Sequence, residues 1–370
     1  MTLNNTPLND VPLNIYAGEE ALKHIQQNGL CSDDISMLLG ASSGPKWLTL
    51  QAIDEFLISD FFKGRTKPLH LLGTSAGAWR MATYAIDLIS DNSLSHQRFT
   101  QAYIEQCYTE KPSPQEILDK CRSIIKELLQ NDGIDTILNH PFAHYNIITS
   151  QCHGLTRSKS KSAKMLGFGI ASLLNAFSRK TLSSQFTRVV MHQAKKPIPT
   201  KVLNDLPTRY HPFSYENFED AILSTGSIPI LIKGVEDVAG KGVYQDGGIT
   251  DYGFDLPLLP ENGFVLYPHF SKFPAPGWFD KSWFSKNSNT KKCVKRIPSH
   301  KNYAKTIMLV PSDEFISKLP NGKIPDRHDF LNFSDEERIA NWTTCVKATQ
   351  LLADDLKTMD WSKRVEALPW

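Results

Sequence analysis

The residues best placed to carry chemistry are Gly73-Thr74-Ser75-Ala76-Gly77, which form a Gly-x-Ser-x-Gly pattern. The pattern follows a short apolar run and opens a stretch with helical character. A serine in this setting sits on a sharp turn between a strand and a helix, called a nucleophile elbow. Gly73 and Gly77 have no Cβ atom, so the strand and the helix can approach closely. The pattern predicts Ser75 as a nucleophile for acyl transfer, with the positive end of the helix behind it.

A second candidate is Asp246, which follows the short predicted strand 242–245 and precedes Gly247 and Gly248. An aspartate that two glycines hold at the end of a strand is well placed to project into a site. Asp-Gly pairs are also frequent in ordinary turns. Taken alone, the tripeptide fits either a bend or a catalytic carboxylate.

A third candidate is the loop Gly40-Ala41-Ser42-Ser43-Gly44-Pro45-Lys46. When a serine attacks an ester, negative charge develops on the carbonyl oxygen, and fixed backbone N–H groups stabilise that charge. Pro45 has no N–H, so the predicted donors of this oxyanion hole are Gly40, Ser42, Ser43 and Gly44. By itself the loop also fits an ordinary glycine-containing turn.

The elements that must position these residues alternate between strand and helix. Residues 35–39 and 69–72 are predicted strands, and the apolar spacing of residues 47–62 is helical, as is the stretch from the elbow to about residue 88. Such an alternation predicts an α/β fold with a mainly parallel central sheet and helices on both of its faces.

Composition narrows the classes of function. The chain has 370 residues and a formal net charge of +2, so its overall charge does not indicate nucleic-acid binding. The six cysteines are widely separated, which argues against a disulfide scaffold or a zinc site. The N-terminus has no secretory signal, and the longest apolar stretch, 165–177, is too short to span a bilayer. We therefore expect a cytoplasmic protein.

Residues 157–201 form a basic amphipathic segment, because no acidic residue occurs between Asp135 and Asp205. Apolar residues at helical spacing within it suit either a helix in the surface of an anionic membrane or a helix packed on the core. Aromatic residues are too sparse there for RNA binding by stacking. The basic residues of the segment are Arg157, Lys159, Lys161, Lys164, Arg179, Lys180, Arg188, Lys195, Lys196 and Lys201.

The order and spacing of the loop at 40–46, the elbow at 73–77 and Asp-Gly-Gly at 246–248 resemble the patatin-like phospholipases. The stretch from Ala221 to Pro229 is also similar to that family. The resemblance covers roughly residues 30–255. It implies a patatin-like α/β fold that hydrolyses acyl esters of phospholipids or other lipids, without a metal or cofactor.

Transferred to this chain, the resemblance implies that Ser75 is the nucleophile and Asp246 its base, with no histidine. The loop would be the oxyanion hole, and Gly73, Gly77, Gly247 and Gly248 would support the elbow and the aspartate turn. The family loop has three glycines, a variable residue, a basic residue and a further glycine. Ala41, Ser42 and Ser43 depart from that pattern, so the identity of the donors stays open.

The expected organisation is an N-terminal segment (1–29), a catalytic domain (30–270) and a helical C-terminal extension packed on it (271–370). One alternative is an α/β-hydrolase with a Ser-Asp-His triad, since His269 and His300 follow Asp246 in the chain. Only about two strands precede Ser75, which is few for that fold. The other alternative is a non-catalytic lipid-binding protein of the same fold.

Overall fold

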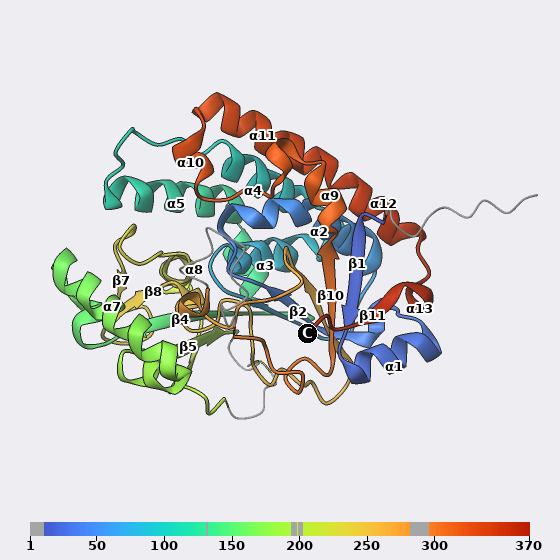
Figure 1. The fold of residues 1–370 in the computed structure, drawn as a ribbon, viewed down its shortest axis with the longest axis horizontal. Coiled ribbons are helices and arrows are strands. Elements are labelled where there is room, and N and C mark those ends of the chain that lie inside the picture. The colour runs from blue at the N-terminus through green and yellow to red at the C-terminus, as the bar shows by residue number, and fades with distance from the viewer. Residues whose placement is uncertain (1–10, 131, 194–197, 199–202, 282–295) are drawn as a thin grey trace, which may run out of the picture.

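The computed structural model describes residues 11–130, 132–193, 198, 203–281 and 296–370, which are built around one mixed β-sheet (Figure 1). The strands run in the order β11-β1-β10-β9-β2-β3-β4-β5-β6, and β8 pairs with both β4 and β7. Their bounds are β1 (Leu13–Ala17), β2 (Ile35–Gly40), β3 (Leu69–Gly73), β4 (Ala143–Cys152), β5 (Phe186–His192), β6 (Thr208–Pro212), β7 (Val235–Glu236), β8 (Val243–Gln245), β9 (Phe264–Pro268), β10 (Thr306–Pro311) and β11 (Val365–Ala367).

The middle of the sheet is parallel. Strands β10, β9, β2, β3 and β4 are parallel neighbours, whereas β1 is antiparallel to β10 and β5 is antiparallel to β4. Every residue of β4 and β10 is buried, as is typical of parallel strands covered on both faces. The predicted α/β class with a mainly parallel central sheet is confirmed.

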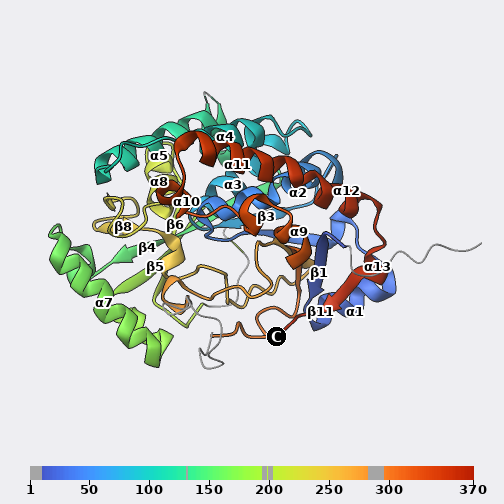
Figure 2. The same cartoon turned by 45° about the horizontal axis from the view of Figure 1, so that its top comes forward.

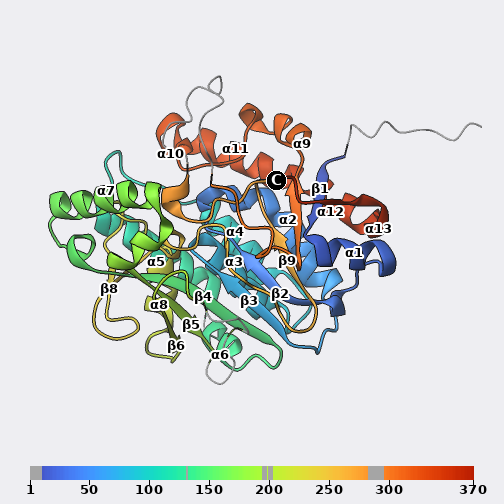
Figure 3. The ribbon, with the colours of Figure 1, turned by 60° about the horizontal axis from the view of Figure 1, so that its bottom comes forward.

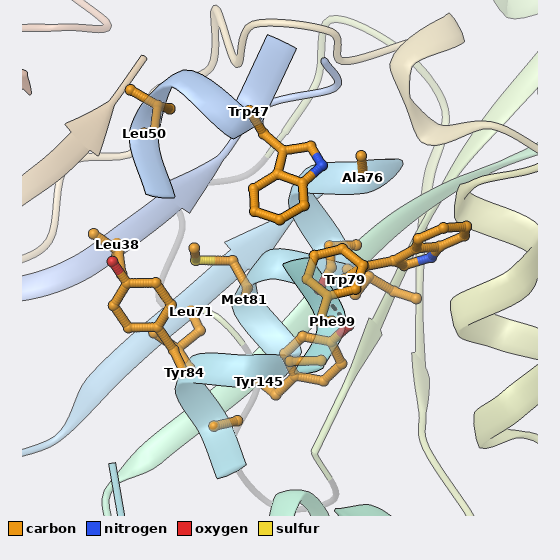
Figure 4. Packing of buried hydrophobic residues seen from close by; sticks show 14 of the residues in the cluster. Leu38, Trp47, Leu50, Leu71, Ala76, Trp79, Met81, Tyr84, Phe99 and Tyr145 are labelled. Atoms are coloured by element: carbon orange, nitrogen blue, oxygen red, sulfur yellow. Dashed lines mark hydrogen bonds between the residues drawn. The ribbon is translucent and has the colours of Figure 1, made fainter. Parts of the chain in front are cut away.

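Every described α-helix except α7 contributes side chains to an apolar cluster on one face of the sheet. Helices α4, α5 and α11 lie together on one side of the sheet in Figures 1 and 2. Within this cluster Trp47 stacks on Phe99 with ring centroids 4.7 Å apart, beside Ala76 at the start of α3 (Figure 4). The helices are α1 (Glu19–Asn28), α2 (Gln51–Phe56), α3 (Ala76–Asp87), α4 (Leu94–Ile104), α5 (Pro114–Leu129), α6 (Gly133–Leu138), α8 (Phe218–Thr225), α9 (Asp313–Ser317), α10 (Asp329–Asn332), α11 (Asp335–Ala348), α12 (Gln350–Thr358) and α13 (Trp361–Arg364).

The opposite face is covered differently from the expectation of helices on both faces. Helix α7 (Lys161–Phe177) packs there only beside β4 and β5, through Phe168 and Ala171. Over the middle of this face the cover comes from segments without helix or strand, 251–263 and 269–277, which bury Tyr252 and Phe254. Tight turns and prolines in these segments leave no helical spacing, and their aromatic side chains fill the space instead.

The sheet extends across both expected domain boundaries (Figure 3). Strand β1 comes from the segment 1–29, and β10 and β11 come from the segment 271–370. Strand β10 lies between β1 and β9, so the C-terminal part of the chain is an integral part of the sheet as well as a group of helices. None of the described helices has the length and apolar character that crossing a bilayer requires.

Candidate active site

Ser75 lies at the turn between β3 and α3, as predicted. Its backbone has φ 54° and ψ −137°, a conformation that residues other than glycine rarely adopt. The Ser75 N–H donates to Thr225 Oγ1 at 2.9 Å, and the same hydroxyl donates to the Ile148 carbonyl at 2.6 Å. The strained turn is thereby tied to α8 and to β4.

Glycines allow α3 to approach the ends of β2 and β3. A Cβ atom on Gly77 would lie 2.1 Å from the Gly40 carbonyl oxygen, and one on Gly40 would lie 2.3 Å from the Gly77 oxygen. A Cβ on Gly73 would lie 2.3 Å from the Ala78 Cα. Real Cβ atoms do not come this close to backbone, so the elbow needs all three glycines. Gly40 therefore has a structural role in addition to its place in the predicted loop.

Asp246 reaches Ser75 from the opposite direction. It follows β8, which is antiparallel to β4, whereas β3 is parallel to β4. The carboxyl ends of β3 and β8 thus meet, and Ser75 Oγ donates to Asp246 Oδ2 at 2.7 Å. The Gly248 N–H donates to Asp246 Oδ1 at 2.7 Å, which fixes the carboxylate. A Cβ on Gly247 would lie 2.0 Å from the Ile148 oxygen, so the turn needs this glycine too.

Burial raises the pKa of the Asp246 carboxyl to about 6. The hydrogen bonds from Ser75 and Gly248 and the nearby charge of Lys281 act in the opposite direction. A carboxyl with this pKa is ionised at neutral pH and is more basic than an exposed aspartate. It is therefore suited to accept a proton from the serine hydroxyl.

The loop after β2 contacts the segment that carries Ser75 and the segment that follows Asp246, and its residues have distinct roles. The Ser42 N–H donates to the Tyr252 carbonyl at 3.2 Å, so this predicted oxyanion donor is already engaged. Ser42 Oγ donates to Thr74 Oγ1 at 3.0 Å, and Thr74 Oγ1 donates to the Asp251 carbonyl at 3.1 Å. The N–H groups of Ser43 and Gly44 have no hydrogen-bond partner among the described residues. Of the three predicted donors that follow β2, Ser42, Ser43 and Gly44, the last two stay available.

Two lysines, Lys46 and Lys281, lie around Ser75 and Asp246, and the sequence motifs gave neither of them a role of its own. Lys281 Nζ is 3.2 Å from the centroid of the Tyr252 ring, and Lys46 Nζ is 5.1 Å from that of Phe270. Burial lowers the pKa of both lysines, and the positive charge of Arg327 lowers both further. Among the described residues, neither lysine forms an ion pair. Lys46 was predicted as part of the loop, whereas Lys281 carries no motif that could have marked it.

A buried ion cluster supports the aspartate turn. Arg188 donates to both Asp251 oxygens, at 2.6 and 2.8 Å, and to both Asp205 oxygens, at 2.8 Å. Asp251 is also the residue whose carbonyl accepts from Thr74. Arg188 is thus fully buried structural support, although the sequence places it in the basic segment 157–201. Lys195, Lys196 and Lys201 of that segment lie outside the described residues.

The histidines of the alternative triad do not contact the described dyad. His269 is buried with its Nδ1 at Ser271, and burial lowers its pKa to about 3, so its ring is neutral. His300 is exposed, with its ring 6.1 Å from that of Trp370. Ser75 Oγ therefore contacts Asp246 directly, without a histidine between them. In the described ranges, no three His, Cys, Asp or Glu side chains gather closely enough to hold a metal ion.

No protein-family model matches this chain, and no curated protein is significantly similar to it in sequence. The likeness to the patatin-like phospholipases therefore depends on the sequence motifs alone. Thr225, which the motifs did not single out, lies in the stretch 221–229 that carries part of that likeness.

Proposed function

We propose that the chain is a patatin-like serine acyl hydrolase that cleaves fatty acyl esters of phospholipids or lysophospholipids. The observation that carries this proposal is the 2.7 Å hydrogen bond from Ser75 Oγ to Asp246 Oδ2 at a strained elbow. A serine that donates directly to a buried carboxylate of raised pKa is an activated nucleophile.

In the proposed reaction, Ser75 Oγ attacks the ester carbonyl carbon while its proton passes to Asp246 Oδ2. The tetrahedral oxyanion accepts hydrogen bonds from the Ser43 and Gly44 N–H groups, near the positive end of α3. The C–O bond to the leaving alcohol then breaks, and the alkoxide takes the proton from Asp246. Asp246 next removes a proton from water, which attacks the acyl carbonyl carbon. The bond from that carbon to Ser75 Oγ then breaks, Ser75 Oγ takes the proton back from Asp246, and the fatty acid leaves.

The cations around the site favour an anionic substrate. Lys281 and Lys46 have no carboxylate partner among the described residues, so a lipid phosphate would supply the missing counter-charge. Phospholipid is therefore the proposed substrate class.

A fluorophosphonate probe tests the proposal, because it bonds covalently to an activated serine. We expect the wild type to be labelled, Ser75→Ala to be unlabelled, and Asp246→Asn to be labelled far more slowly. His269→Ala is the matched control and should be labelled like the wild type. A lipid panel on the reactive protein then identifies the head group and the acyl position.

The alternatives give different results. Strongly reduced labelling of His269→Ala or His300→Ala would favour a triad enzyme. A folded wild type that neither reacts with the probe nor hydrolyses any ester, with or without anionic vesicles, would favour a lipid-binding protein.

A further inference from the structure

Helix α7 presents a wide apolar face to solvent. Phe177 is 88% exposed and Leu173 is 70% exposed, which is unusual for large apolar side chains. The members of this face are one, three or seven residues apart, and at 3.6 residues per turn these spacings place them on one side of the helix. The exposed face of α7 comprises Met165, Leu166, Leu173, Leu174 and Phe177.

The orientation of this face is fixed by the opposite side of α7. Gly167, Phe168, Ala171 and Asn175 are buried against the protein. A Cβ on Gly167 would lie 2.8 Å from both Leu155 Cβ and the Thr156 nitrogen, so the helix approaches its neighbour closely. Because this side is already packed, the helix cannot turn its exposed face inward without losing that packing.

A polar contact fixes the same orientation. Asn175 Nδ2 donates to the buried carboxylate of Asp280 at 2.8 Å, and Arg179 donates to the other oxygen of that carboxylate at 2.9 Å. Rotation of the helix would remove the Asn175 donor from the buried Asp280 carboxylate, and the loss of a buried hydrogen bond would destabilise the fold.

Every charged side chain on α7 and on the residues that flank it, from 157 to 180, is basic. Lys161 and Lys164 lie on the first turn of α7, and no acidic residue occurs in the chain from 136 to 204. The exposed basic residues that flank the helix are Arg157, Lys159, Lys161 and Lys180. Among the described residues, the one ion pair that these four side chains form joins Lys159 to Glu236 at 3.4 Å.

We propose that the exposed face of α7 docks into the surface of an anionic lipid membrane. The apolar side chains enter the boundary between head groups and acyl chains, and the flanking lysines contact lipid phosphates. A second copy of the chain is a poorer occupant, because a symmetric contact would bring two basic surfaces together.

The docking surface is joined to the dyad through short contacts. Arg179, just after α7, donates to the carbonyl of Thr250, four residues beyond Asp246, at 2.6 Å. Phe168 of α7 and Ile249 of the aspartate turn belong to the same buried cluster. Docking through α7 would therefore bring lipid to the proposed active site, but binding itself does not require Ser75 to be catalytic.

Co-sedimentation with vesicles tests the proposal on the full chain. The vesicles contain phosphatidylcholine either alone or mixed with phosphatidylglycerol. We expect the wild type to bind the mixed vesicles, to bind phosphatidylcholine alone far more weakly, and to dissociate at high salt. Ser75→Ala should bind like the wild type, which separates docking from hydrolysis.

Two double variants, each with a matched control, locate the surface. Leu173→Ser/Phe177→Ser should weaken binding at least about tenfold, since both side chains would enter the lipid. Leu331→Ser/Leu351→Ser is its control, because these leucines are 83% and 59% exposed on α10 and α12. Lys161→Gln/Lys164→Gln should weaken binding roughly fivefold for each lysine removed. The exposed pair Lys347→Gln/Lys357→Gln is its control.

The proposal is overturned if the wild type does not bind mixed vesicles, or if the α7 variants bind no worse than their controls. It is equally overturned if the wild type is a dimer that Leu173→Ser/Phe177→Ser dissociates and that shows no affinity for vesicles. Because Lys161, Leu173 and Phe177 are exposed and Lys164 is only half-buried, unchanged thermal unfolding should accompany each loss of binding.

Discussion

Thr225 Oγ1 accepts the backbone N–H of Ser75 at 2.9 Å, although the two residues are 150 positions apart in the chain. The same hydroxyl donates to the Ile148 carbonyl on β4. One side chain thus ties the backbone of Ser75 to β4, the strand that pairs with both β3 and β8, and these two strands lead to Ser75 and Asp246.

Thr225→Val keeps the shape of the side chain but removes both hydrogen bonds. We expect kcat for an ester substrate to fall about 10- to 100-fold with little change in KM, because Ser75 loses its fixed position and not its substrate contacts. Thr225→Ser should restore most of the rate. A wild-type rate in Thr225→Val with a reduced rate in Thr225→Ser would mean that packing of the methyl group, rather than the hydroxyl, holds the elbow.

The strain at Ser75 predicts an order of stability between two inactive variants. Both Ser75→Ala and Ser75→Gly lose the hydrogen bond to Asp246, but only glycine adopts φ 54° and ψ −137° without strain. We expect Ser75→Gly to unfold in urea with a free energy about 1 kcal/mol above that of Ser75→Ala. An alanine variant as stable as the glycine variant would show that this backbone is not strained.

The raised pKa of Asp246 makes its ionised carboxylate a cost to stability at neutral pH. Its pKa of about 6 in the folded protein exceeds the ordinary 3.8, so folding favours the protonated form. The stabilising contribution is complete below about pH 4 and is lost as the pH rises through about 6. Above that pH the ionised group costs roughly 3 kcal/mol relative to the protonated one.

Asp246→Asn should therefore become progressively more stable than the wild type between about pH 4 and about pH 7. The measurement is urea unfolding of both proteins across this range. A constant difference between them would contradict the raised pKa. Esterase activity of the wild type should fall as the pH drops through about 6, where Asp246 becomes protonated.

Lys281 should influence the acid limb of the activity profile, which is the fall in activity as the pH drops. Its positive charge lowers the pKa of Asp246, so Lys281→Met should move this limb to higher pH. The readout is kcat/KM against pH for a neutral ester, which separates the effect on Asp246 from any contact with an anionic substrate. Lys347→Met, at an exposed position on α11, should leave the limb unchanged. A limb that does not move in Lys281→Met would place the lysine's charge too far from the dyad to matter.

Local sequence was sufficient for the elbow and for the class of fold. Residues 69–77 specify a strand, a turn and a helix through contacts between near neighbours, and two glycines make that turn sterically accessible. The same local signal predicted the parallel middle of the sheet. It missed β1, because five residues of mixed character form a strand only through their pairing with β10 and β11.

The sequence by itself determined that Ser75 would be displayed at a turn and that Asp246 would follow a short strand between glycines. Only the tertiary structure decided that these two side chains meet, 171 positions apart, without a histidine between them. It also decided that Ser42 is engaged with Tyr252, that Arg188 is buried, and that α7 exposes an apolar face. The reason is physical: the backbone shape of a turn depends on its own residues, whereas the partners of a side chain depend on strand order and helix rotation. Packing across the whole chain sets those two features.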